Sequence, residues 1–542
     1  MTWIHPLSAE VGESADVLGG KGHGLVVLRR LGLPVPPGFV IGTAACRAFL
    51  RDGRLPDGLE AELAFAVAGL ESATGRHLGG PDRPLVVSVR SGGGAPMPGM
   101  MSTTLNLGLT AAATAGLAAE TGDPRFALDS RLRFLSSFAC TVLGLSAERL
   151  DAVVREATRR AAGGAQARLT AAIRGVEALV REQADAAVPD DAARQLRMAV
   201  RAVLSSWHTP RATTYRDLHG IPHDAGTAVT VQAMVFGNRD ENSGSGVAFS
   251  RNPSTGEPVP FGEVLFGRQG DDVVSGRSTT RPLPDLTERE PAVWADLLAA
   301  MTRIEGHHRD ACGVEFTYET GRLWLLQVRP GGLAGRAAVR AAVDLADETV
   351  ISRREAVLRV SPQHLHHARA PRIDPTDGID VVVRGLGACP GVAVGRVVTT
   401  SDRAVRMAGG GPVILIRPHT SPLDMHGLAA AAGIVTARGG PASHAAVVAR
   451  AMGKPAVVGA TGLTVDVAGA CVRAGGRTFP EGTLVTVDGA GGEVVVGSPR
   501  VVTAPDVHLR RLLEWADECS GDDSDRDDTQ RLAAAHAALR HA

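Results

Sequence analysis

The chain has 542 residues, a length that exceeds a single hydrophobic core and predicts about three domains. Its formal net charge of −1, without a basic block or an aromatic stacking series, argues against a nucleic-acid partner. Residues 1–6 show no secretion signal, and no apolar run approaches the ~20 residues that span a bilayer. The six cysteines form no CxxC pair, which argues against a zinc site and a disulfide framework, so we expect a cytoplasmic enzyme.

The first distinctive segment is a glycine-rich stretch around Lys21, residues 18–24, which predicts a turn followed by a helix. Its glycines allow the backbone to approach an anion closely, although their spacing is not that of a P-loop. Lys21 and Lys454 are the only lysines among 57 basic residues. Because arginine fills every other basic position, each retained lysine indicates a need for a compact ammonium group, as at a phosphate.

The next segment is a predicted strand over 85–90 that ends in Arg90 and runs into a glycine- and hydroxyl-rich loop over 91–104. A strand followed by such a loop directs backbone N–H groups at the phosphates of a nucleotide, and Arg90 can neutralise phosphate charge. Residues 105–220 are rich in alanine and arginine with helical spacing and predict a helical scaffold. Alternating apolar and polar residues beyond position 227 then predict an antiparallel sheet.

A hairpin is predicted over 313–330, with two strands on either side of a turn at 319–322. Gln327 and Arg329 share side-chain parity, so the folded hairpin can bring Glu315 to the same face. A carboxylate and an amide oxygen together form a hard oxygen site suited to Mg²⁺. Arg329 beside them suits a transferring phosphoryl group, so the hairpin predicts a metal and phosphoryl-transfer site.

His444 follows a glycine pair at 439–440, and a predicted strand over 412–417 lies upstream. Ser443 is placed to N-cap a helix of small residues over 445–452. The imidazole then falls in the first helical turn, where backbone N–H groups are free and the macrodipole is positive. Both features stabilise a dianionic phosphoryl group on the ring, so the pattern predicts a phosphohistidine. The alternative interpretation is a histidine packed beside a helix start.

Several long, ordered motifs give the chain a resemblance to the pyruvate phosphate dikinase family, from about residue 19 to residue 517. They are Gly-Gly-Lys21-Gly, Ser88-Val-Arg90-Ser-Gly, Met97-Pro-Gly-Met-Met, Val231-Gln-x-Met-Val, Arg251-Asn-Pro-Ser-Thr-Gly-Glu, Glu315 with Gln327 and Arg329, Thr420-Ser-Pro-x-Asp, and the His444 loop. The resemblance implies an α/β multidomain protein, in which an ATP-grasp nucleotide-binding domain precedes a smaller swivelling α/β phosphohistidine domain.

Four segments are expected on this basis, and the helical linker among them includes a proline-bearing stretch at 369–378. They are an ATP-grasp domain over 1–335 with a helical insertion at about 110–220, a helical linker over 336–380, a phosphohistidine swivelling domain over 381–505, and a terminal helix with an acidic disordered tail over 506–542.

In the family, ATP donates its terminal phosphates to the histidine, orthophosphate removes one of them as pyrophosphate, and the phosphohistidine then travels to a phosphoenolpyruvate/pyruvate barrel. The resemblance implies that ATP binds at Lys21, Arg90, Gly99, Thr103, Gln232, Glu315, Gln327 and Arg329, with Mg²⁺ held by Glu315 and Gln327. It also implies that Arg133, Asp271, Asp272 and Arg329 take part in the phosphorylation of His444.

Three departures from the family pattern matter. Gly313 stands where the family has an acidic residue two positions before Glu315, which reduces the anionic ligands for a metal. Ala442 stands where the family has a threonine. No segment resembles the barrel, and the chain stops shortly after Asp517. The phosphoryl acceptor is therefore expected on another chain, most simply a separately encoded pyruvate/phosphoenolpyruvate barrel.

Two alternatives to this enzyme remain open. A small-molecule phosphotransferase similar to rifampin phosphotransferase also joins an ATP-grasp domain to a swivelling histidine, but that family has an acceptor-binding domain where this chain has only residues 331–380. A non-catalytic nucleotide-sensing partner of a full-length dikinase is favoured by Gly313. We expect ATP and Mg²⁺ as cofactors, orthophosphate as a further substrate, and neither a membrane nor a nucleic-acid partner; a homodimer is left open.

Overall fold

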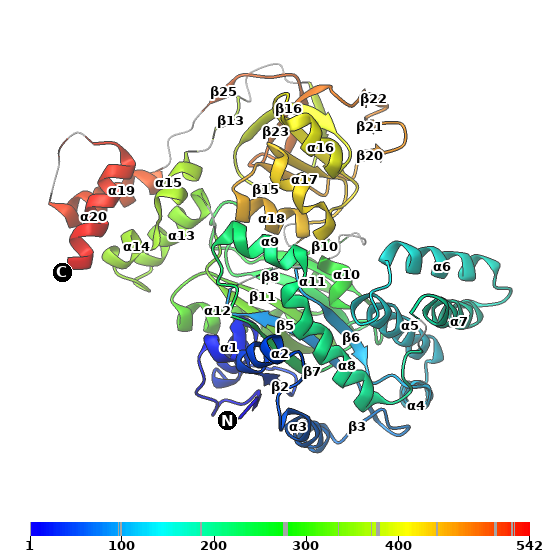
Figure 1. Cartoon of the computed structure of the whole chain (residues 1–542). Coiled ribbons are helices and arrows are strands. Elements are labelled where there is room, and N and C mark those ends of the chain that lie inside the picture. The colour runs from blue at the N-terminus through cyan, green and yellow to red at the C-terminus, as the bar shows by residue number, and fades with distance from the viewer. Residues whose placement is uncertain are drawn as a thin grey trace. The chain divides into compact units, whose positions relative to one another are not determined.

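The computed structural model divides into two compact units (Figure 1). The first comprises Met1–Arg239 with Trp324–Gln327, and the second comprises Asp240–Leu323 with Val328–Ala542. None of the helices that the structure describes is long and apolar enough to cross a membrane. The described residues are 2–95, 97, 100–184, 187–274, 280–333, 335–369, 371–374, 380–440, 443–502, 507–521, 524 and 526–541.

The first unit is built on a five-stranded antiparallel sheet in the order β1-β2-β7-β5-β6. The central strand β7 is buried along nearly its whole length, and helices α1, α2 and α8 pack on the sheet. The elements are β1 (Ile4–Pro6), α1 (Ala15–Arg30), β2 (Gly38–Ile41), α2 (Thr43–Asp52), α3 (Leu59–Thr74), β3 (His77–Leu78), β4 (Pro84–Leu85), β5 (Val87–Gly93), β6 (Thr103–Leu107) and β7 (Thr227–Ala233).

The glycine-rich stretch over 18–24 does not form a separate turn, so that prediction is wrong. It lies inside α1, whose helical geometry is interrupted at Gly19, with a φ of 68°. A Cβ at Gly19 would collide with the carbonyl oxygen of Gly92. Glycine therefore lets α1 lie directly on the backbone of β5, which is a tertiary requirement that the local pattern does not reveal.

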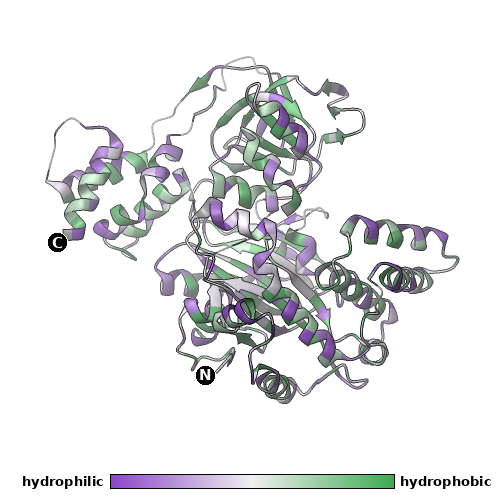
Figure 2. Ribbon diagram, viewed as in Figure 1, coloured by the Kyte–Doolittle hydropathy of each residue, from purple (hydrophilic) through white to green (hydrophobic). Residues whose placement is uncertain are grey.

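The predicted helical scaffold between β6 and β7 is confirmed. Its helices alternate hydrophilic and hydrophobic residues, as α6 shows in Figure 2. In α8 the apolar positions Leu196, Val200 and Val203 recur at helical spacing and are fully or almost fully buried, so each helix is stabilised by one apolar face. The helices are α4 (Ala111–Thr121), α5 (Pro124–Thr141), α6 (Ala147–Arg160), α7 (Ala165–Ala184), α8 (Ala192–Ser205) and α9 (Pro210–His219).

A second five-stranded antiparallel sheet has the order β10-β9-β8-β11-β12, so the predicted antiparallel sheet and hairpin are confirmed. It belongs to the second unit except for Trp324–Gln327 of β12. Thr320 and Gly321 form the hairpin turn with positive φ of 51° and 74°, as tight hairpins require. The elements are β8 (Gly244–Phe249), β9 (Phe261–Phe266), α10 (Gly270–Val274), β10 (Arg281–Pro282), α11 (Leu286–Arg289), α12 (Pro291–His308), β11 (Cys312–Glu319) and β12 (Arg322–Pro330).

Five helices of the second unit share one apolar core, and we call them the helical body. The helices predicted within 331–370 are confirmed. The disordered tail is wrong from Asp528 onward, because Leu532 and Ala535 are fully buried in this core and burial stabilises a helix there. Residues 522, 523 and 525 of the acidic stretch lie outside the described part. The helices are α13 (Arg336–Asp347), α14 (Arg353–Arg359), α15 (Pro362–Ala368), α19 (Val507–Ser520) and α20 (Asp528–His541).

The remaining residues of the second unit, 380–502, form an α/β domain around an eight-stranded sheet in the order β14-β24-β23-β16-β17-β18-β19-β15. Strands β16 to β19 run parallel, and the others join antiparallel. The predicted strand over 412–417 and the predicted helix over 445–452 are confirmed as β17 and α18. The main elements are β14 (Val381–Arg384), β15 (Leu386–Cys389), β16 (Val392–Val398), α16 (Ser401–Ala408), β17 (Val413–Arg417), α17 (Met425–Ala430), β18 (Gly433–Thr436), α18 (His444–Met452), β19 (Ala456–Val458), β23 (Leu484–Asp488) and β24 (Glu493–Val496).

Two smaller sheets accompany this domain. One is an antiparallel three-stranded sheet, and the other is a two-stranded ribbon that pairs the segments leading into and out of the domain. Part of the predicted proline-bearing linker at 369–378 lies outside the described residues. The strands are β20 (Leu463–Asp466), β21 (Cys471–Ala474) and β22 (Arg477–Pro480) in the first, and β13 (Arg372–Ile373) with β25 (Val501–Val502) in the second.

Candidate active site

Three of the residues predicted to bind a nucleotide share one face of the sheet in the first unit. On β5, Ser88 and Arg90 point to the same face because side chains alternate along a strand. Gln232 on β7 lies opposite Ser88, and Thr103 on β6 lies opposite Arg90. Directly opposed residues of antiparallel strands project to the same side, so Arg90, Thr103 and Gln232 form a polar strip across three adjacent strands.

Lys21 reaches the same face from α1. A Cβ placed on Gly92, two residues beyond Arg90 on β5, would lie 3.3 Å from Cβ of Lys21 and 3.8 Å from its Cγ. Gly92 has the parity of Arg90, so Lys21 lies at the end of the polar strip. Gly20 allows the same close approach, since a Cβ there would lie 3.4 Å from the carbonyl oxygen of Gly93. The glycines thus bring an ammonium group onto the end of β5.

Two side chains of this face have partners within the first unit. The guanidinium of Arg90 donates to the backbone oxygen of Leu326 and to Oε1 of Gln327, both at 3.3 Å. Gln232 is almost fully buried, and its amide nitrogen donates to the carbonyl oxygen of Pro36 at 3.1 Å. Arg90 and Gln327, which the sequence assigned to one site, are therefore held together before any ligand binds.

For the remaining predicted residues, the structure gives a position but no evidence of a role, or gives no position. Nε of Arg133 donates to the carboxylate of Asp129 at 3.0 Å, one turn earlier on α5. Asp271 and Asp272 lie in the first turn of α10, which packs on β8 and β9 in the second unit. Gly99 lies outside the described residues. Roles for these four residues stay predictions.

Glu315 and Arg329 meet across the hairpin of the second unit, with Nη2 of Arg329 3.3 Å from Oε1 of Glu315. Both side chains are partly exposed, so a ligand can reach them. Gly313 lies two residues before Glu315 on the same face of β11. A Cβ there would lie only 3.1 Å from two ring carbons of Phe249, so any larger side chain must displace that ring. The glycine that departs from the family pattern thus has a packing cause.

His444 lies where two parallel strands end. β17 and β18 are parallel neighbours, Thr420 follows β17, and His444 follows β18 as the first residue of α18. The loops after two such strands meet at the carboxyl edge of the sheet, where ligands bind in open α/β folds. Oγ1 of Thr420 lies 3.2 Å from Nδ1 of His444. Nε2 is buried and has no hydrogen-bond partner among the described residues. The ring is therefore held through one nitrogen and offers the other.

The environment of His444 keeps the ring neutral. Burial lowers the pKa of His444 to about 4, and the charge of Asp424 opposes this shift. Burial alone would raise the pKa of Asp424, but hydrogen bonds from Ser401 and Ser421 and the charge of Arg417 lower that pKa overall. Oδ1 of Asp424 accepts from the Ser401 hydroxyl at 2.7 Å, and Oδ2 accepts from the Ser421 N–H at 2.9 Å. A neutral imidazole keeps a lone pair on one nitrogen at pH 7.

At the ends of α18, the predicted N-cap position of Ser443 is confirmed without the capping bond, and the expectation that Lys454 faces a phosphate is wrong. Ser443 occupies the N-cap position, but its side chain makes no capping bond, and its buried hydroxyl has no partner among the described residues. Nζ of Lys454 donates to the carbonyl oxygens of Ala429 and Ala431 at the end of α17. Carbonyl groups at a helix C-terminus attract a cation, so this lysine stabilises α17 and does not face a phosphate.

A buried carboxylate that sequence reasoning did not single out lies against the His444 loop. Glu263 on β9 is 3% exposed, and a Cβ on Gly440 would coincide with its carboxylate. Burial raises the pKa of Glu263 to about 7, against the Thr280 hydroxyl and the charge of Arg450. Strand parity alone could mark Glu263 as inward-facing, but the approach of Gly440 depends on tertiary structure.

Arg450, on α18, completes the surroundings of this carboxylate. Its Nη1 donates to the carbonyl oxygen of Ala388 at 3.2 Å. Burial lowers the pKa of Arg450 to about 10, with the charges of Cys389 and Glu263 opposing and that of Arg329 adding to the shift. Arg450 is therefore the arginine whose charge acts on Glu263, next to the His444 loop.

The first unit thus has a polar face of the kind expected to bind a nucleotide. The second unit contains an α/β domain that carries His444. Residues 15–64 and 51–283 match the model of the pyruvate phosphate dikinase AMP/ATP-binding domain, and residues 409–492 match that of the mobile domain of PEP-utilising enzymes. The chain belongs to the pyruvate phosphate dikinase family.

Named relatives support this assignment. The chain is 42% identical over 539 residues to pyruvate, phosphate dikinase of Rhizobium meliloti (strain 1021), covering 95% of this chain and 60% of the relative. It is 41% identical over 518 residues to pyruvate, phosphate dikinase 2 of Oryza sativa subsp. japonica, covering 93% and 58%. The enzyme of Rickettsia conorii is 37% identical, with 93% and 59% covered. The chain therefore spans about 60% of the length of the curated relatives it matches.

Proposed function

We propose that this chain is an ATP-dependent phosphotransferase that phosphorylates its own His444, with an ATP-grasp nucleotide-binding domain and a swivelling phosphohistidine domain. The observation that supports this most strongly is the state of the imidazole. Thr420 engages Nδ1, while Nε2 is buried and has no partner among the described residues. When Nδ1–H donates to the Thr420 hydroxyl, the lone pair of the neutral ring lies on Nε2, which is then the nucleophile.

The chemistry follows in two balanced steps. Nε2 forms a bond to the phosphorus through which the two terminal phosphates of ATP are attached to AMP. The bond from that phosphorus to the AMP oxygen breaks, and AMP leaves with the electron pair. An oxygen of orthophosphate then forms a bond to the terminal phosphorus, and pyrophosphate departs. The bond from that phosphorus to the bridging oxygen breaks, and its electron pair stays on the oxygen of the phosphoryl group that Nε2 carries. One phosphoryl group stays on Nε2 as a phosphoramidate.

The ATP-binding residues supply charge and donors to this reaction. Lys21 offers a point charge at the end of β5, and Arg90 a guanidinium on the adjoining face. Thr103, Gln232, Gln327 and the backbone at Gly99 position the nucleotide. Arg329 offsets the negative charge that develops on the transferring group, as cationic clamps do in phosphoryl transfer, and we assign Arg133, Asp271 and Asp272 to the same step.

Glu315 and Gln327 would hold Mg²⁺, and their donors fit this ion because both are oxygens. Each donor is held by an arginine in the structure, Glu315 by Arg329 and Gln327 by Arg90. Phosphate groups compete for the same arginines, which frees both donors when ATP binds. The described residues contain no group of three or more His, Cys, Asp or Glu side chains that could hold a metal. The phosphates would therefore complete the coordination, and the ion would neutralise their charge.

The final acceptor belongs to the proposal as well. We infer that the phosphoryl group passes from His444 to an acceptor site on another chain, a pyruvate/phosphoenolpyruvate barrel. A cytoplasmic location and a homodimer stay predictions. A small-molecule phosphotransferase is the alternative for the acceptor. The nucleotide-sensing alternative rested on Gly313, and the contact of that position with Phe249 supplies another reason for the glycine.

The identity of the leaving group tests the proposal. Wild type and His444→Asn are mixed with Mg²⁺ and an excess of ATP over protein, without orthophosphate, and the nucleotides are separated and counted. We expect about one AMP per wild-type chain and none from His444→Asn. ADP as the sole product, or equal AMP from both proteins, would contradict the proposed first step.

A further inference from the structure

The C-terminal end of α18, the helix that begins with His444, rests on a residue of the helical body. Gly453 caps α18 in the left-handed conformation, with φ 63° and ψ 31°. The N–H of Lys454 bonds the carbonyl oxygen of Ala449 at 2.9 Å, which completes a Schellman cap. A Cβ on Gly453 would collide with Cε1 and Nε2 of His367, on α15. The imidazole of His367 therefore fills the space that a side chain at position 453 would need.

His367 is also confined from its other side. A Cβ on Gly335, the buried N-cap residue of α13, would lie 2.8 Å from Cβ of His367 and 3.2 Å from its backbone carbonyl. The ring of His366 lies beside it at a tilt of 60°, with ring centroids 5.7 Å apart. Burial, then the neighbouring His366, lower the pKa of His367, so the ring meets Gly453 uncharged at pH 7. Two glycines from different elements thus contact one histidine, Gly453 at the imidazole and Gly335 at Cβ and the backbone.

The helix that carries His367 is itself fixed. Leu365 and Ala368 of α15 are buried in the core of the helical body. The Ser361 hydroxyl accepts from the His364 N–H, and Nδ1 of His364 accepts from the Ser361 N–H, so a capping box closes the start of α15. Because α15 is held by its capping box and its buried residues, His367 resists displacement when α18 packs against it.

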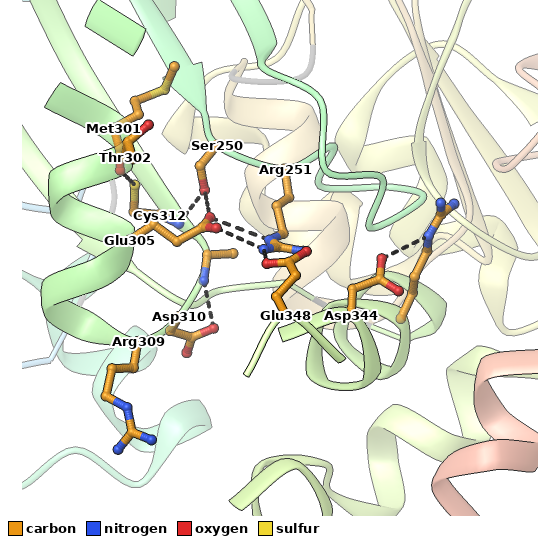
Figure 3. A network of polar contacts seen from close by, with 12 residues as sticks. Ser250, Arg251, Met301, Thr302, Glu305, Arg309, Asp310, Cys312, Asp344 and Glu348 are labelled. Atoms are coloured by element: carbon orange, nitrogen blue, oxygen red, sulfur yellow. Dashed lines mark hydrogen bonds and ion pairs between the residues drawn. The ribbon is translucent and has the colours of Figure 1, made fainter. Parts of the chain in front are cut away.

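A buried arginine ties the helical body to the first sheet of the second unit. Arg251, just beyond β8, is 2% exposed, and Figure 3 shows its guanidinium between two carboxylates. Nη2 of Arg251 lies 2.8 Å from Oε1 of Glu305 on α12 and 2.6 Å from Oε2 of Glu348, just after α13. A buried, doubly paired arginine is costly to break, so the helical body and this sheet hold together.

We propose that His367 is a positioning residue that seats the C-terminal end of α18 and thereby fixes the orientation of its N-terminal residue, His444, and of its Nε2. This role rests on the proposed autophosphorylation. α18 has nine residues and spans about 13 Å, so a tilt at Gly453 is carried to His444. A misplacement of about 1 Å at a reacting atom can cost roughly 100-fold in rate.

A glycine pair provides the test with a matched control. Gly220 caps α9 with φ 62° and ψ 30°, nearly the dihedral angles of Gly453, but a Cβ there would meet nothing within 4 Å. Gly453→Ala and Gly220→Ala therefore introduce the same backbone strain, and only the first meets His367. Single-turnover labelling of His444 with β-labelled ATP and Mg²⁺ gives the rate constant at saturating ATP and the ATP concentration for half-saturation.

We expect Gly453→Ala to lower the rate constant at least about tenfold at unchanged half-saturation, and Gly220→Ala to change neither. The double variant Gly453→Ala/His367→Ala should recover part of the loss, because the collision is gone. Labelling of Gly453→Ala as fast as that of Gly220→Ala, or a loss that His367→Ala does not relieve, would overturn the proposal.

A second measurement distinguishes failure of the proposed function from failure of the contact between His367 and Gly453. If wild type takes no label, the autophosphorylation proposal fails. Amide hydrogen exchange then tests whether His367 still supports α18 at Gly453. Amides of residues 444–453 should then exchange faster in Gly453→Ala than in wild type, and His367→Ala should reduce the difference. Unchanged exchange in Gly453→Ala would overturn the contact itself.

Discussion

Oγ1 of Thr420 lies 3.2 Å from Nδ1 of His444, across the loops that follow two adjacent parallel strands. Thr420 is 5% exposed and His444 is partly buried, so water competes poorly for this bond. When Nδ1 donates to this oxygen, the tautomer that bears a lone pair on Nε2 is stabilised. One hydroxyl thus orients the imidazole and, under the proposed function, leaves Nε2 as the nitrogen that attacks.

Thr420→Val replaces this hydroxyl with a methyl group of similar size. We expect the rate of His444 labelling from ATP to fall about tenfold, the loss that one orienting hydrogen bond of ~1.4 kcal/mol predicts. Thr420→Ser, which keeps the hydroxyl, should label at nearly the wild-type rate. Equal rates for the valine and serine variants would show that the contact does not orient the ring.

Lys21 is predicted to contact ATP phosphate as a point charge. Its Cβ lies against the backbone of Gly92. A planar guanidinium does not reproduce the compact charge of an ammonium group. Lys21→Arg should lower isotope exchange between ATP and its products at least about tenfold, at the scale of one charge-assisted hydrogen bond. Lys454→Arg is the control, because either cation can cap the carbonyl groups of α17. Wild-type exchange in Lys21→Arg would refute the assignment.

Glu263 predicts a pH dependence of stability. Burial raises the pKa of Glu263 from 4.5 to about 7, so the folded state favours the protonated carboxyl. Its contribution to stability is fully present below about pH 4.5 and is lost as the pH rises through about 7. Glu263→Gln cannot ionise at this position. The thermal midpoint of wild type should therefore fall relative to that of Glu263→Gln between pH 5 and 8, and a constant difference would show that the carboxyl does not titrate there.

Gly313 leaves the hairpin with one carboxylate, Glu315, for a divalent cation. A hard cation with fewer anionic oxygens is held more weakly, and the ATP phosphates bring the missing charge. Titration calorimetry should show weak Mg²⁺ binding to the free protein and at least about tenfold tighter binding with a non-hydrolysable ATP analogue. Equal affinities in the two states would contradict this account.

A paired variant isolates the effect of position 313. Gly313→Asp alone should lose stability, because its Cβ comes within 3.1 Å of the Phe249 ring. In a Phe249→Ala background the added carboxylate has room and lies on the face of Glu315. Mg²⁺ affinity of the free protein should then rise. An unchanged affinity would place the cation elsewhere.

Much of the fold follows from periodic patterns in the sequence. The hairpin with Thr320 and Gly321 at its turn, the helices between β6 and β7, and α18 were predictable because apolar spacing and turn residues agree there. The acidic composition around residues 521–528 led to a wrong prediction for the tail. Burial of Leu532 against helices more than 150 residues earlier stabilises α20, and local composition carries no information on such contacts.

In the candidate site, too, some residues are identified by local sequence patterns and others only by tertiary contacts. Glycine-flanked Lys21 and His444 stand out in the sequence, and the register of β5 explains why Arg90, Thr103 and Gln232 face one way. Lys454 looked like Lys21 from its composition and flanking glycine, but its ammonium caps α17. The contact of Glu263 with Gly440 depends on two segments far apart in the chain, so no local signal could have identified it.

The measurement that tests the central claim most directly is the fate of label on His444. Wild type and His444→Asn are incubated with Mg²⁺ and either β- or γ-labelled ATP, and orthophosphate is then added. We predict that both labels first attach to wild type in an acid-labile, base-stable linkage. After orthophosphate, the γ-label should leave as pyrophosphate while the β-label stays on His444. Label on His444→Asn, or an acid-stable linkage in wild type, would contradict the account.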